Sequence, residues 1–411
     1  MTQSQCRFCN SDLKHTFVDL GMSPLSNSYL ASSDLNKAEK FYPLHAYVCD
    51  NCFLVQLEEF ESPDIIFSDY AYFSSYSDSW LNHARKYTEL MIDRFQFNQS
   101  SQVIEIASND GYLLQFFQTR NIPVLGVEPA RNVAKVAIEK GIDTVVKFFG
   151  VQTAQALENK GKQADLLLGN NVLAHVPDIN DFVGGMQIIL KPDGVITMEF
   201  PHLLQLINQN QFDTIYHEHF SYLSLLTVSK IFAHHKLTIF DVEELPTHGG
   251  SLRIYAKHES NDKLPINNRL LALQQKEKEA GLEEISTYLD FSQKVISTKQ
   301  KLLSFLIEIK KAGKSIVGYG APAKGNTLLN YCGIRTDFLD YTCDRSPHKQ
   351  GKFLPGTHIP IYHPDKIKET KPDYVLMLPW NLKKEITQQL SYIRDWGGKF
   401  VVPIPEVEII A

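Results

Sequence analysis

The chain has 411 residues, of which 43% are hydrophobic and 21% are charged, and its formal net charge at pH 7 is −6. This length predicts two or three domains, and the composition is that of a soluble globular protein. The negative charge argues against a nucleic-acid or anionic-membrane partner, and no apolar run approaches the length that crosses a bilayer. The first ten residues are polar and include two cysteines, so we expect no signal peptide and a cytoplasmic protein, in which disulfides are rare.

Two C-x-x-C pairs stand near the start of the chain, with 39 residues (10 to 48) between them. Four cysteines in this arrangement are typical of a tetrahedral zinc site, and no nearby ligand set suggests a catalytic metal. A loop or strand pair should fill the interval. Unmetallated thiols and a redox motif are the alternatives, but neither pair sits at a strand–helix junction. The predicted ligands of a structural Zn²⁺ ion are Cys6, Cys9, Cys49 and Cys52.

The segment from Tyr70 to Trp80 is rich in tyrosine and serine. It is too polar for a core and too aromatic for a plain linker, which favours a binding surface for a polar ligand. Packing of two lobes against each other is the alternative. Residues 80–95 have the pattern of an amphipathic helix.

A strand–turn–helix pattern at residues 103–120 is the centre of the predicted fold. Residues 103–106 are a buried strand, 107–111 a small polar turn and 112–120 a helix. A second strand ends in Glu128, where a carboxylate typically binds ribose hydroxyls. The turn lacks G-x-G-x-x-G and carries Asp110, which suits a cationic nucleoside without phosphates, S-adenosylmethionine. An ordinary turn without a ligand is the alternative.

Further strands are predicted at residues 144–146, 165–170 and 195–200. Phe148 follows the first of them, where it stacks on adenine or only packs. His175 lies just past the second, on the ligand side of an open α/β sheet. The predicted cofactor contacts are Glu105, Ala107, Ser108, Asn109, Asp110, Gly111, Glu128, Phe148, Asn170 and Asn171.

The densest polar cluster is Tyr216-His-Glu-His219. In an extended chain His217 and His219 would share one face, and Tyr216 and Glu218 the other. Histidine is well suited to general acid–base work near neutral pH. A metal site is disfavoured because the spacing of H-E-x-x-H is absent, and a structural polar network is the other alternative.

The last third of the chain predicts a second α/β unit. An antiparallel strand pair (237–242 and 251–257) carries His248-Gly-Gly-Ser-Leu-Arg253 at its connection, and residues 264–312 form one or two helices. Strands follow at 315–320, 338–343, 374–378 and 399–402. The loop that contains Gly320 and Lys324 resembles a phosphate cradle, although neither nucleotide fingerprint is complete, so a substrate pyrophosphate would fit. A Gly-rich turn that only permits close packing is the alternative.

Taken together, these motifs resemble one family. They are the cysteine pairs, Tyr72-Phe-Ser-Ser-Tyr76, Glu105-Ile-Ala-Ser-Asn-Asp-Gly111, Asn171-Val-Leu-Ala-His-Val-Pro177, Tyr216-His-Glu-His219, His248-Gly-Gly-Ser-Leu-Arg253 and Gly318-Tyr-Gly-Ala-Pro-Ala-Lys-Gly-Asn326. The pattern is similar to that of the sugar C-methyltransferases of deoxysugar biosynthesis, which use S-adenosylmethionine to methylate C3 of nucleotide-linked 4-keto-6-deoxy sugars. The resemblance covers essentially the whole chain. One departure is Ala107, where the family has glycine; alanine costs little there if its φ is negative.

The resemblance implies a mechanism without a catalytic metal or a redox cofactor. A base removes the C3 proton, which the 4-ketone acidifies, and the enolate carbon takes the methyl group. His219 would be the base, Tyr216 and His175 would donate toward the 4-oxygen or relay protons, and Glu218 would orient the imidazole or a sugar hydroxyl. Tyr72 would join them in the sugar pocket. The implied substrate contacts are Tyr70, Tyr76, Glu199, His202, Arg253, Gly320, Lys324 and Asn326.

We therefore expect an α/β protein of three parts. Residues 1–68 form a zinc-binding lobe, 69–262 a Rossmann-like methyltransferase domain with a seven-stranded sheet, and 263–411 a helical linker with a Rossmann-like domain for the nucleotide sugar. A monomer without nucleic-acid or membrane partners is expected, and the nucleotide is thymidine, guanosine or cytidine diphosphate. The alternatives are an NAD-dependent nucleotide-sugar dehydrogenase or epimerase, a zinc-ribbon scaffold without activity, and an RNA methyltransferase.

Overall fold

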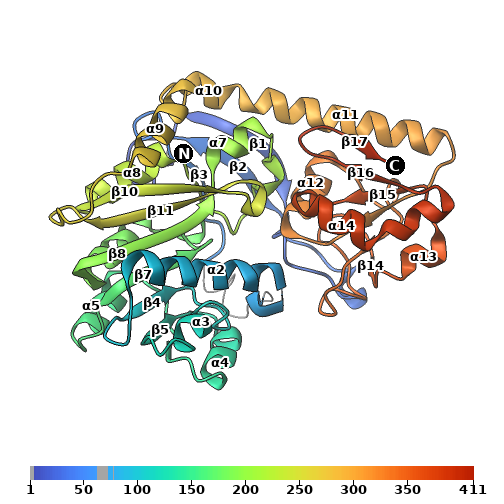
Figure 1. The fold of residues 1–411 in the computed structure, drawn as a ribbon. Helices are drawn as coiled ribbons and strands as arrows, with labels where there is room; N and C mark the ends of the chain where they lie inside the picture. The colour runs from blue at the N-terminus through green and yellow to red at the C-terminus, as the bar shows by residue number, and fades with distance from the viewer. Residues whose placement is uncertain (1–3, 63–72, 77) are drawn as a thin grey trace.

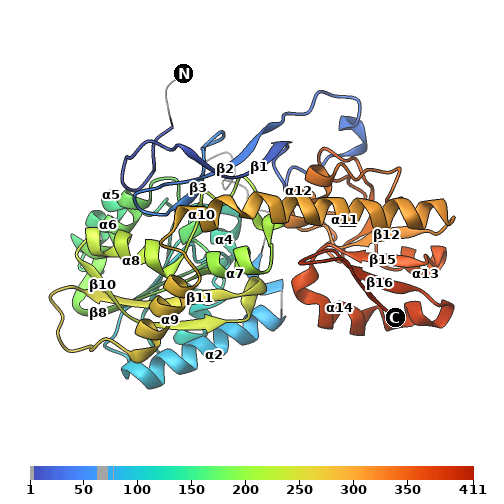
Figure 2. The ribbon, with the colours of Figure 1, turned by 90° about the horizontal axis from the view of Figure 1, so that it is seen from above.

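The chain folds into three sheets that are joined and covered by helices (Figures 1 and 2). The computed structural model describes residues 4–62, 73–76 and 78–411. The predicted site residues Tyr70 and Tyr72 lie outside the described residues. We refer to the four-stranded, seven-stranded and six-stranded sheets as the N-terminal, central and C-terminal sheets.

The N-terminal sheet has the strand order β1-β2-β3-β9 and is antiparallel. Its strands are β1 (His15–Ser23), β2 (Tyr42–Val48), β3 (Val55–Leu57) and β9 (Ser221–Tyr222). β1 and β2 form the strand pair expected between the two cysteine pairs. β9 lies between β8 and β10 in the sequence, within the central domain. No local pattern predicts that it pairs with the N-terminal sheet.

The central sheet has the order β10-β11-β8-β7-β4-β5-β6. Its strands are β4 (Val103–Ile106), β5 (Val124–Val127), β6 (Thr144–Val145), β7 (Ala164–Asn170), β8 (Leu190–Pro201), β10 (Leu237–Leu245) and β11 (Ser251–His258). The order reverses beside β4, because β5 and β6 lie on one side of it and β7 and β8 on the other. Ligands of open α/β sheets bind at the carboxyl ends of the strands at such a point.

Helices cover the central sheet, and this explains why its inner strands are continuous apolar runs. All four side chains of β4 are buried. The helices are α2 (Asp78–Phe95), α3 (Leu114–Gln118), α4 (Arg131–Glu139), α5 (Val151–Glu158), α6 (Ile179–Ile189), α7 (Leu203–Asn208) and α8 (Leu225–His234). The strand predicted at 195–200 begins earlier, because residues 190–194 also belong to β8.

Three helices, rather than one or two, lead to the C-terminal sheet. They are α9 (Asn268–Glu279), α10 (Ile285–Leu289) and α11 (Phe291–Lys311). Figure 2 shows α11 running from the central part of the molecule across the C-terminal sheet. Phe291 stacks on Phe17 of β1 at 4.5 Å between ring centres, so the linker also packs against the N-terminal sheet.

The C-terminal sheet has the order β14-β13-β12-β15-β16-β17. Its strands are β12 (Ile316–Tyr319), β13 (Thr342–Cys343), β14 (Ile361–Tyr362), β15 (Tyr374–Met377), β16 (Lys399–Val402) and β17 (Glu408–Ile410), and its helices are α12 (Ala323–Cys332), α13 (Lys366–Thr370) and α14 (Lys383–Gln389). β17 is antiparallel and the other neighbours are parallel. The strand predicted at 338–343 shrinks to β13, and β14 and β17 are not predicted. The predicted fold class is confirmed.

The apolar core joins the parts of the chain. One cluster of buried side chains runs from the N-terminal sheet through α10 and α11 into the C-terminal sheet, and includes Phe17, Phe291 and Val317. A second cluster contains the cysteine pairs and the central sheet. The N-terminal lobe therefore packs on both other parts. Within the described residues, no helix is long and apolar enough to cross a membrane.

Candidate active site

The two cysteine pairs converge on one point. The four Sγ atoms lie within 4.8 Å of one another, and Cys6–Cys52 and Cys9–Cys49 are each 3.5 Å apart. A tetrahedral Zn²⁺ site with Zn–S bonds of about 2.3 Å separates its sulfurs by roughly 3.8 Å, so this geometry fits a zinc ion. All four ligands come from the protein and leave no position for a substrate. The site is therefore structural.

Arg7, inside the first cysteine pair, connects this metal site to the central domain. Its guanidinium donates hydrogen bonds to the carbonyl oxygens of Pro177, at 2.5 Å, and of Leu57. It also lies 5.4 Å from the centre of the Phe220 ring. Pro177 and Phe220 belong to the two segments that carry the predicted catalytic histidines.

Tyr216 and His219 form a hydrogen-bonded pair. The Tyr216 hydroxyl is 2.8 Å from His219 Nε2, and His219 Nδ1 is 2.9 Å from the carbonyl oxygen of Thr214. A carbonyl only accepts, so Nδ1 carries the proton and Nε2 accepts from the phenol. The backbone N–H of His219 donates to Tyr216 O at 2.9 Å and closes a turn. The segment is therefore not extended, and the sharing of a face by His217 and His219 that an extended chain would give does not occur.

The two residues between this pair face the N-terminal lobe. His217 Nε2 lies 3.1 Å from Pro43 O, and Glu218 Oε1 accepts a hydrogen bond of 2.6 Å from Asn27. Burial lowers the pKa of His217 and raises the pKa of Glu218 to about 7. The Glu218 carboxylate thus contacts the N-terminal lobe and not the imidazole of His219, and the other expected role, orienting a sugar hydroxyl, stays a prediction.

His175 lies beside the Tyr216–His219 pair, at the end of the 3-10 turn Leu173–His175 that follows β7. Its ring centre is 4.7 Å from that of His219, and its Nδ1 donates to Glu218 O at 2.8 Å. Burial lowers the pKa of His175 to about 4 and that of His219 well below 6.5, although both side chains keep some exposure. Both imidazoles are neutral at pH 7, and Nε2 of His175 is an acceptor. This geometry favours proton relay by His175 over donation to a substrate oxygen.

The predicted cofactor turn lies where the strand order of the central sheet reverses. Glu128, which follows β5, accepts hydrogen bonds from the backbone N–H of Asn109 at 2.9 Å and of Ala130 at 2.8 Å. Asp110 is buried and pairs with Lys140 at 3.5 Å. The two carboxylates therefore hold the turn against the neighbouring strand and helix.

Four buried polar atoms at this edge have no hydrogen-bond partner among the described residues. They are Ser108 Oγ, Asp110 Oδ1, Asn170 Nδ2 and Asn171 Oδ1. Buried polar groups are normally paired, so unpaired ones at the carboxyl ends of β4 and β7 indicate a polar ligand. Glu105 in β4 is also buried, and burial raises its pKa well above 4.5. These donors, acceptors and carboxyl groups fit the hydroxyl, amino and sulfonium groups of S-adenosylmethionine.

Ala107 adopts a left-handed conformation with φ of 55°. A non-glycine residue in this region costs on the order of 1 kcal/mol. The expectation of a small cost rested on a negative φ and is wrong. Gly111 has φ of 75°, and a Cβ there would lie 2.3 Å from Ile142 Cδ1, so this position requires glycine.

Two predicted aromatic contacts are exposed. Tyr76, in the 3-10 turn Ser74–Tyr76, is 74% exposed and stacks on Phe73 at 5.4 Å. The same turn is tied to the cofactor edge, because Ser74 N–H donates to Asn109 Oδ1 at 2.9 Å. Phe148 after β6 is 42% exposed and is open to a stacking ring.

Glu199 and Arg253, predicted to bind substrate, pair with each other instead. Glu199 Oε2 lies 3.0 Å from Arg253 Nη2 and 2.9 Å from His83 Nε2, and Arg253 also pairs with Glu243 at 3.0 Å. Burial opposes ionisation of Glu199, but His83 and Arg253 lower its pKa. Their charges are compensated inside the protein, so both residues have a structural role.

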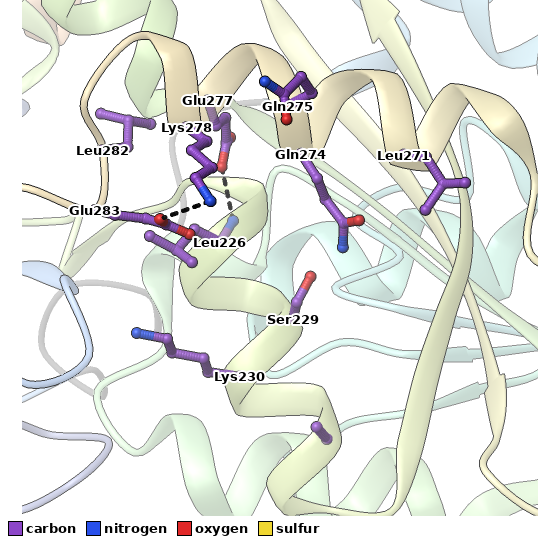
Figure 3. A pocket seen from close by; sticks show the side chains of 11 residues that line it. Leu226, Ser229, Lys230, Leu271, Gln274, Gln275, Glu277, Lys278, Leu282 and Glu283 are labelled. Carbon is purple, nitrogen blue, oxygen red and sulfur yellow. Dashed lines mark hydrogen bonds and ion pairs between the residues drawn. The ribbon is translucent and has the colours of Figure 1, made fainter.

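His202, the other residue predicted at this strand exit, is 1% exposed and lies 2.6 Å from Glu277 of α9. Glu277 also accepts from the backbone N–H groups of Leu225 and Leu226 at the start of α8. His202 is thus part of the packing between α7, α8 and α9. A surface pocket of about 610 Å³ opens between α8 and α9 next to this pair, and Glu277 is among the residues that line it (Figure 3).

Lys324, in the first turn of α12, faces the central domain. Its Nζ lies 4.3 Å from the ring centre of Trp380 and donates to Asn381. Burial lowers its pKa to about 8, against the opposing effect of Asp213. Trp380 in turn donates to Asp213 at 2.7 Å, so the C-terminal domain meets the segment just before Tyr216 here.

Packing explains the other two residues predicted in this loop. Asn326 is buried and donates to Ser26 O at 2.5 Å. Gly320 has φ of 88°, and a Cβ there would lie 2.5 Å from Pro379 Cδ. For these two positions the structure supports the packing alternative that the sequence left open.

Two aromatic residues at the site, His248 and Trp80, lie in segments that the sequence analysis singled out but are not among its predicted site residues. His248 Nε2 lies 3.0 Å from Asn171 Nδ2, and its ring centre is 5.4 Å from that of Trp80. Trp80 also stacks on His83 at 4.9 Å. The Gly-Gly pair after His248 was the one sequence signal, because it marks a backbone that approaches other groups closely.

Comparisons with known proteins agree with this architecture. Three family models match in chain order: a zinc binding domain at residues 6–67, a methyltransferase domain at 80–242 and a C-methyltransferase C-terminal domain at 246–405. The C-methyltransferase NovU of Streptomyces niveus is 35% identical over 407 residues, 99% of this chain and 97% of that protein. The chain belongs to the C-methyltransferase family. It is an S-adenosylmethionine-dependent enzyme with a zinc-binding N-terminal domain.

Other similarities are partial. The ubiquinone biosynthesis O-methyltransferase of Bartonella tribocorum is 28% identical over 23% of this chain and 39% of that protein. A structure of PH0226 from Pyrococcus horikoshii covers 48% of this chain and 99% of its own, with a TM-score of 0.38 and 15% identity. A structure of magnesium protoporphyrin IX methyltransferase of Synechocystis, with bound S-adenosylmethionine, covers 43% of this chain and 78% of its own, with a TM-score of 0.33 and 13% identity. These TM-scores add nothing to the family assignment.

Cys9→Ser removes one of the four zinc ligands of this C-methyltransferase. We expect the variant to lose its bound zinc and to melt about 10 °C lower, because metal-binding free energy is folding free energy. Atomic absorption and calorimetry measure both. Cys332→Ser is the control and keeps its zinc, since Cys332 is a buried thiol outside the cluster. Full zinc content in Cys9→Ser would contradict the four-cysteine site.

Ala107→Gly relieves the left-handed strain in the cofactor turn. We expect the free energy of unfolding to rise by roughly 0.5–1 kcal/mol in urea titrations without cofactor. Ala312→Gly is the matched control, because Ala312 is exposed at the end of α11 with φ of −77°. That substitution should destabilise the protein. If both substitutions destabilise it equally, residue 107 carries no strain.

Proposed function

We propose that this C-methyltransferase acts on C3 of a nucleotide-diphosphate 4-keto-6-deoxy sugar. The observation that carries the proposal is the neutral, partly exposed imidazole of His219, hydrogen-bonded to Tyr216 beside His175. A neutral imidazole accepts a proton at physiological pH. The motifs that resemble sugar C-methyltransferases, and the full-length similarity to a C-methyltransferase, support the same reaction.

The chemistry needs a base and a hydrogen-bond donor at the ketone. The 4-ketone acidifies the C3 proton, because the carbanion delocalises as an enolate. His219 takes this proton, directly or through the Tyr216 hydroxyl, and its Nδ1–H remains bound to Thr214 O. One donor placed at a developing oxyanion is worth about 3–4 kcal/mol. Bound S-adenosylmethionine supplies the electrophilic methyl group.

Lys324 is the proposed contact for the diphosphate. It is the cation of the loop that resembles a phosphate cradle, and it borders Asp213 and Trp380 near the Tyr216–His219 pair. An anionic group beside it would compensate the desolvation that lowers its pKa. The nucleotide would then lie on the C-terminal domain, with the sugar directed toward His219.

We retain further proposals from the sequence. The chain divides into residues 1–68, 69–262 and 263–411 as functional parts. The enzyme works in the cytoplasm and as a monomer, with a thymidine, guanosine or cytidine diphosphate sugar as its substrate. Tyr76 is proposed to line the sugar pocket, and the same prediction for Tyr70 and Tyr72 lies outside the described residues.

Mass spectrometry of the sugar product tests the proposal. The purified enzyme is incubated with S-adenosylmethionine and a panel of nucleotide-linked 4-keto-6-deoxy hexoses. We expect a gain of one methyl group on one panel member, with stoichiometric S-adenosylhomocysteine. His219→Asn and Tyr216→Phe should each lower kcat by about 10²–10⁴-fold while cofactor binding stays intact. Cofactor binding without methylation of any panel member would refute the substrate, and full turnover in both variants would refute the assigned pair.

The pH dependence of kcat/KM should show both perturbed groups. The pKa of His219 is lowered, so its neutral form persists below pH 6.5, and activity should be retained at pH 5.5. Lys324, with a pKa of about 8, loses its charge as pH rises through that value, so the KM for the sugar should rise above pH 8.

Lys324→Arg is the control for the alkaline limb. Arginine keeps its charge, so the rise in KM should move to higher pH or disappear. The KM for S-adenosylmethionine should stay flat across the same range. An acid limb at pH 6.5, or an alkaline limb unchanged in Lys324→Arg, would contradict this assignment.

A further inference from the structure

His248 lies in the 3-10 turn Thr247–Gly249, which connects β10 to β11 in the central sheet. Its φ and ψ are 54° and 20°, a left-handed backbone conformation that residues other than glycine rarely adopt. Gly249 and Gly250 follow with φ of 90° and 119°. Strain of this kind persists where the surrounding structure fixes it, and it clusters at functional sites.

The surrounding structure does fix this turn. Thr247 Oγ1 donates to Glu199 Oε1 at 2.9 Å, and Gln211 Nε2 donates to Gly249 O at 2.7 Å. Glu199 is itself held by Arg253 and His83, as described above. The buried charges that were expected to bind substrate thus hold the turn that presents His248.

The imidazole of His248 stands between the cofactor edge and the C-terminal domain. On one side it contacts Asn171, directly after β7, and the ring of Trp80. On the other side the turn packs against the C-terminal domain, because a Cβ on Gly249 would lie 2.7 Å from Cη2 of Trp380, the ring beneath Lys324. Its side chain is nevertheless exposed to solvent. A ligand that joins the cofactor to Lys324 has to pass this imidazole.

The hydrogen-bond pattern leaves one donor for such a ligand. Nδ2 of Asn171 donates to Nε2 of His248, so the proton of the neutral imidazole is on Nδ1. Among the described residues, Nδ1 has no hydrogen-bond partner. Part of the ring surface is open, but the protein atoms packed around the imidazole desolvate it, and this desolvation and the nearby charge of Lys324 lower the pKa of His248 to about 4. The ring is therefore neutral at pH 7.

We propose that His248 contacts the sugar of the substrate and donates its Nδ1–H to one of the sugar oxygens. The inference rests on the proposed function and extends it. The cofactor's methyl group and the diphosphate are expected on opposite sides of His248, so the sugar is the part of the substrate beside it. His248 would then be a catalytic residue from the connection between β10 and β11.

Three substitutions separate the donor from the shape of the side chain. His248→Asn keeps an N–H near the position of Nδ1 and tolerates the left-handed backbone. His248→Gln carries its amide further out, and His248→Phe has no donor. We expect kcat/KM for the sugar to stay within about threefold of wild type in His248→Asn and to fall by about 30-fold or more in the other two. The Kd of S-adenosylmethionine should change by less than about twofold in all three.

His358 provides a matched control for the backbone strain. It has φ of 57° and pairs with Glu39 at 3.1 Å on the C-terminal domain. His358→Asn and His358→Phe change the same residue type in the same conformation. Both should leave kcat/KM for the sugar unchanged, which shows that relief of strain does not produce the effect at residue 248.

A second readout follows the C3 proton without methyl transfer. The enzyme is incubated in D₂O with the sugar and S-adenosylhomocysteine, and deuterium uptake at C3 is measured. If His248 donates to the 4-oxygen, uptake falls in His248→Phe in step with kcat. If it donates to a hydroxyl, uptake at saturating sugar is unchanged and KM rises. Either result supports the sugar contact.

The inference is overturned if His248→Phe keeps kcat/KM within about threefold of His248→Asn, or if all three substitutions lower it equally. It is also overturned if the losses follow a weaker affinity for S-adenosylmethionine. The wild-type reaction separates this from failure of the proposed function. If the wild-type enzyme methylates no sugar, the proposed function fails, whereas normal turnover by His248→Phe refutes only the role of His248.

Discussion

The antiparallel pairing of β3 with β9 holds the proposed catalytic pair, Tyr216 and His219, in place. β9 begins two residues after His219, and its Ser221 pairs with Gln56 of β3. A two-residue strand has no stability of its own, so its position depends on the partner strand. β3 starts three residues after Cys52, a zinc ligand, and Arg7 of the other cysteine pair binds the carbonyl at its end. The zinc ion thus fixes a strand, and that strand fixes the Tyr216–His219 pair.

The same lobe also connects the Tyr216–His219 pair to the C-terminal domain. Asn27 donates to the Glu218 carboxylate, and Asn326 of α12 donates to the carbonyl of Ser26. One loop of the N-terminal lobe therefore contacts both the segment 216–219 and the helix that carries Lys324. A zinc-stapled lobe that is too small for a large core of its own obtains its stability from these neighbours, and in return it sets their relative position.

Much of this arrangement is predictable from short segments. The four cysteines, the turn after β4 and the Tyr216–His219 cluster are each encoded within a few residues. The structure gathers the four cysteines around one point, and it places the turn where the strand order of the central sheet reverses. The failures have a common cause. Glu199 and Arg253 have the polarity of ligand contacts, but a buried charge needs a partner, and theirs lie on distant elements. The strand β9, the turn at residues 216–219 and the strained φ of Ala107 likewise depend on tertiary contacts that no local pattern encodes.

The central claim is that a neutral His219 makes C3 of a 4-keto sugar nucleophilic. Nuclear magnetic resonance of the product formed from S-adenosylmethionine with a ¹³C-labelled methyl group tests it most directly. The account predicts one labelled methyl bound to carbon, on a C3 that carries no proton, so that the methyl protons show no coupling to a sugar proton. A labelled methyl on oxygen, or on a carbon that retains its proton, would contradict it.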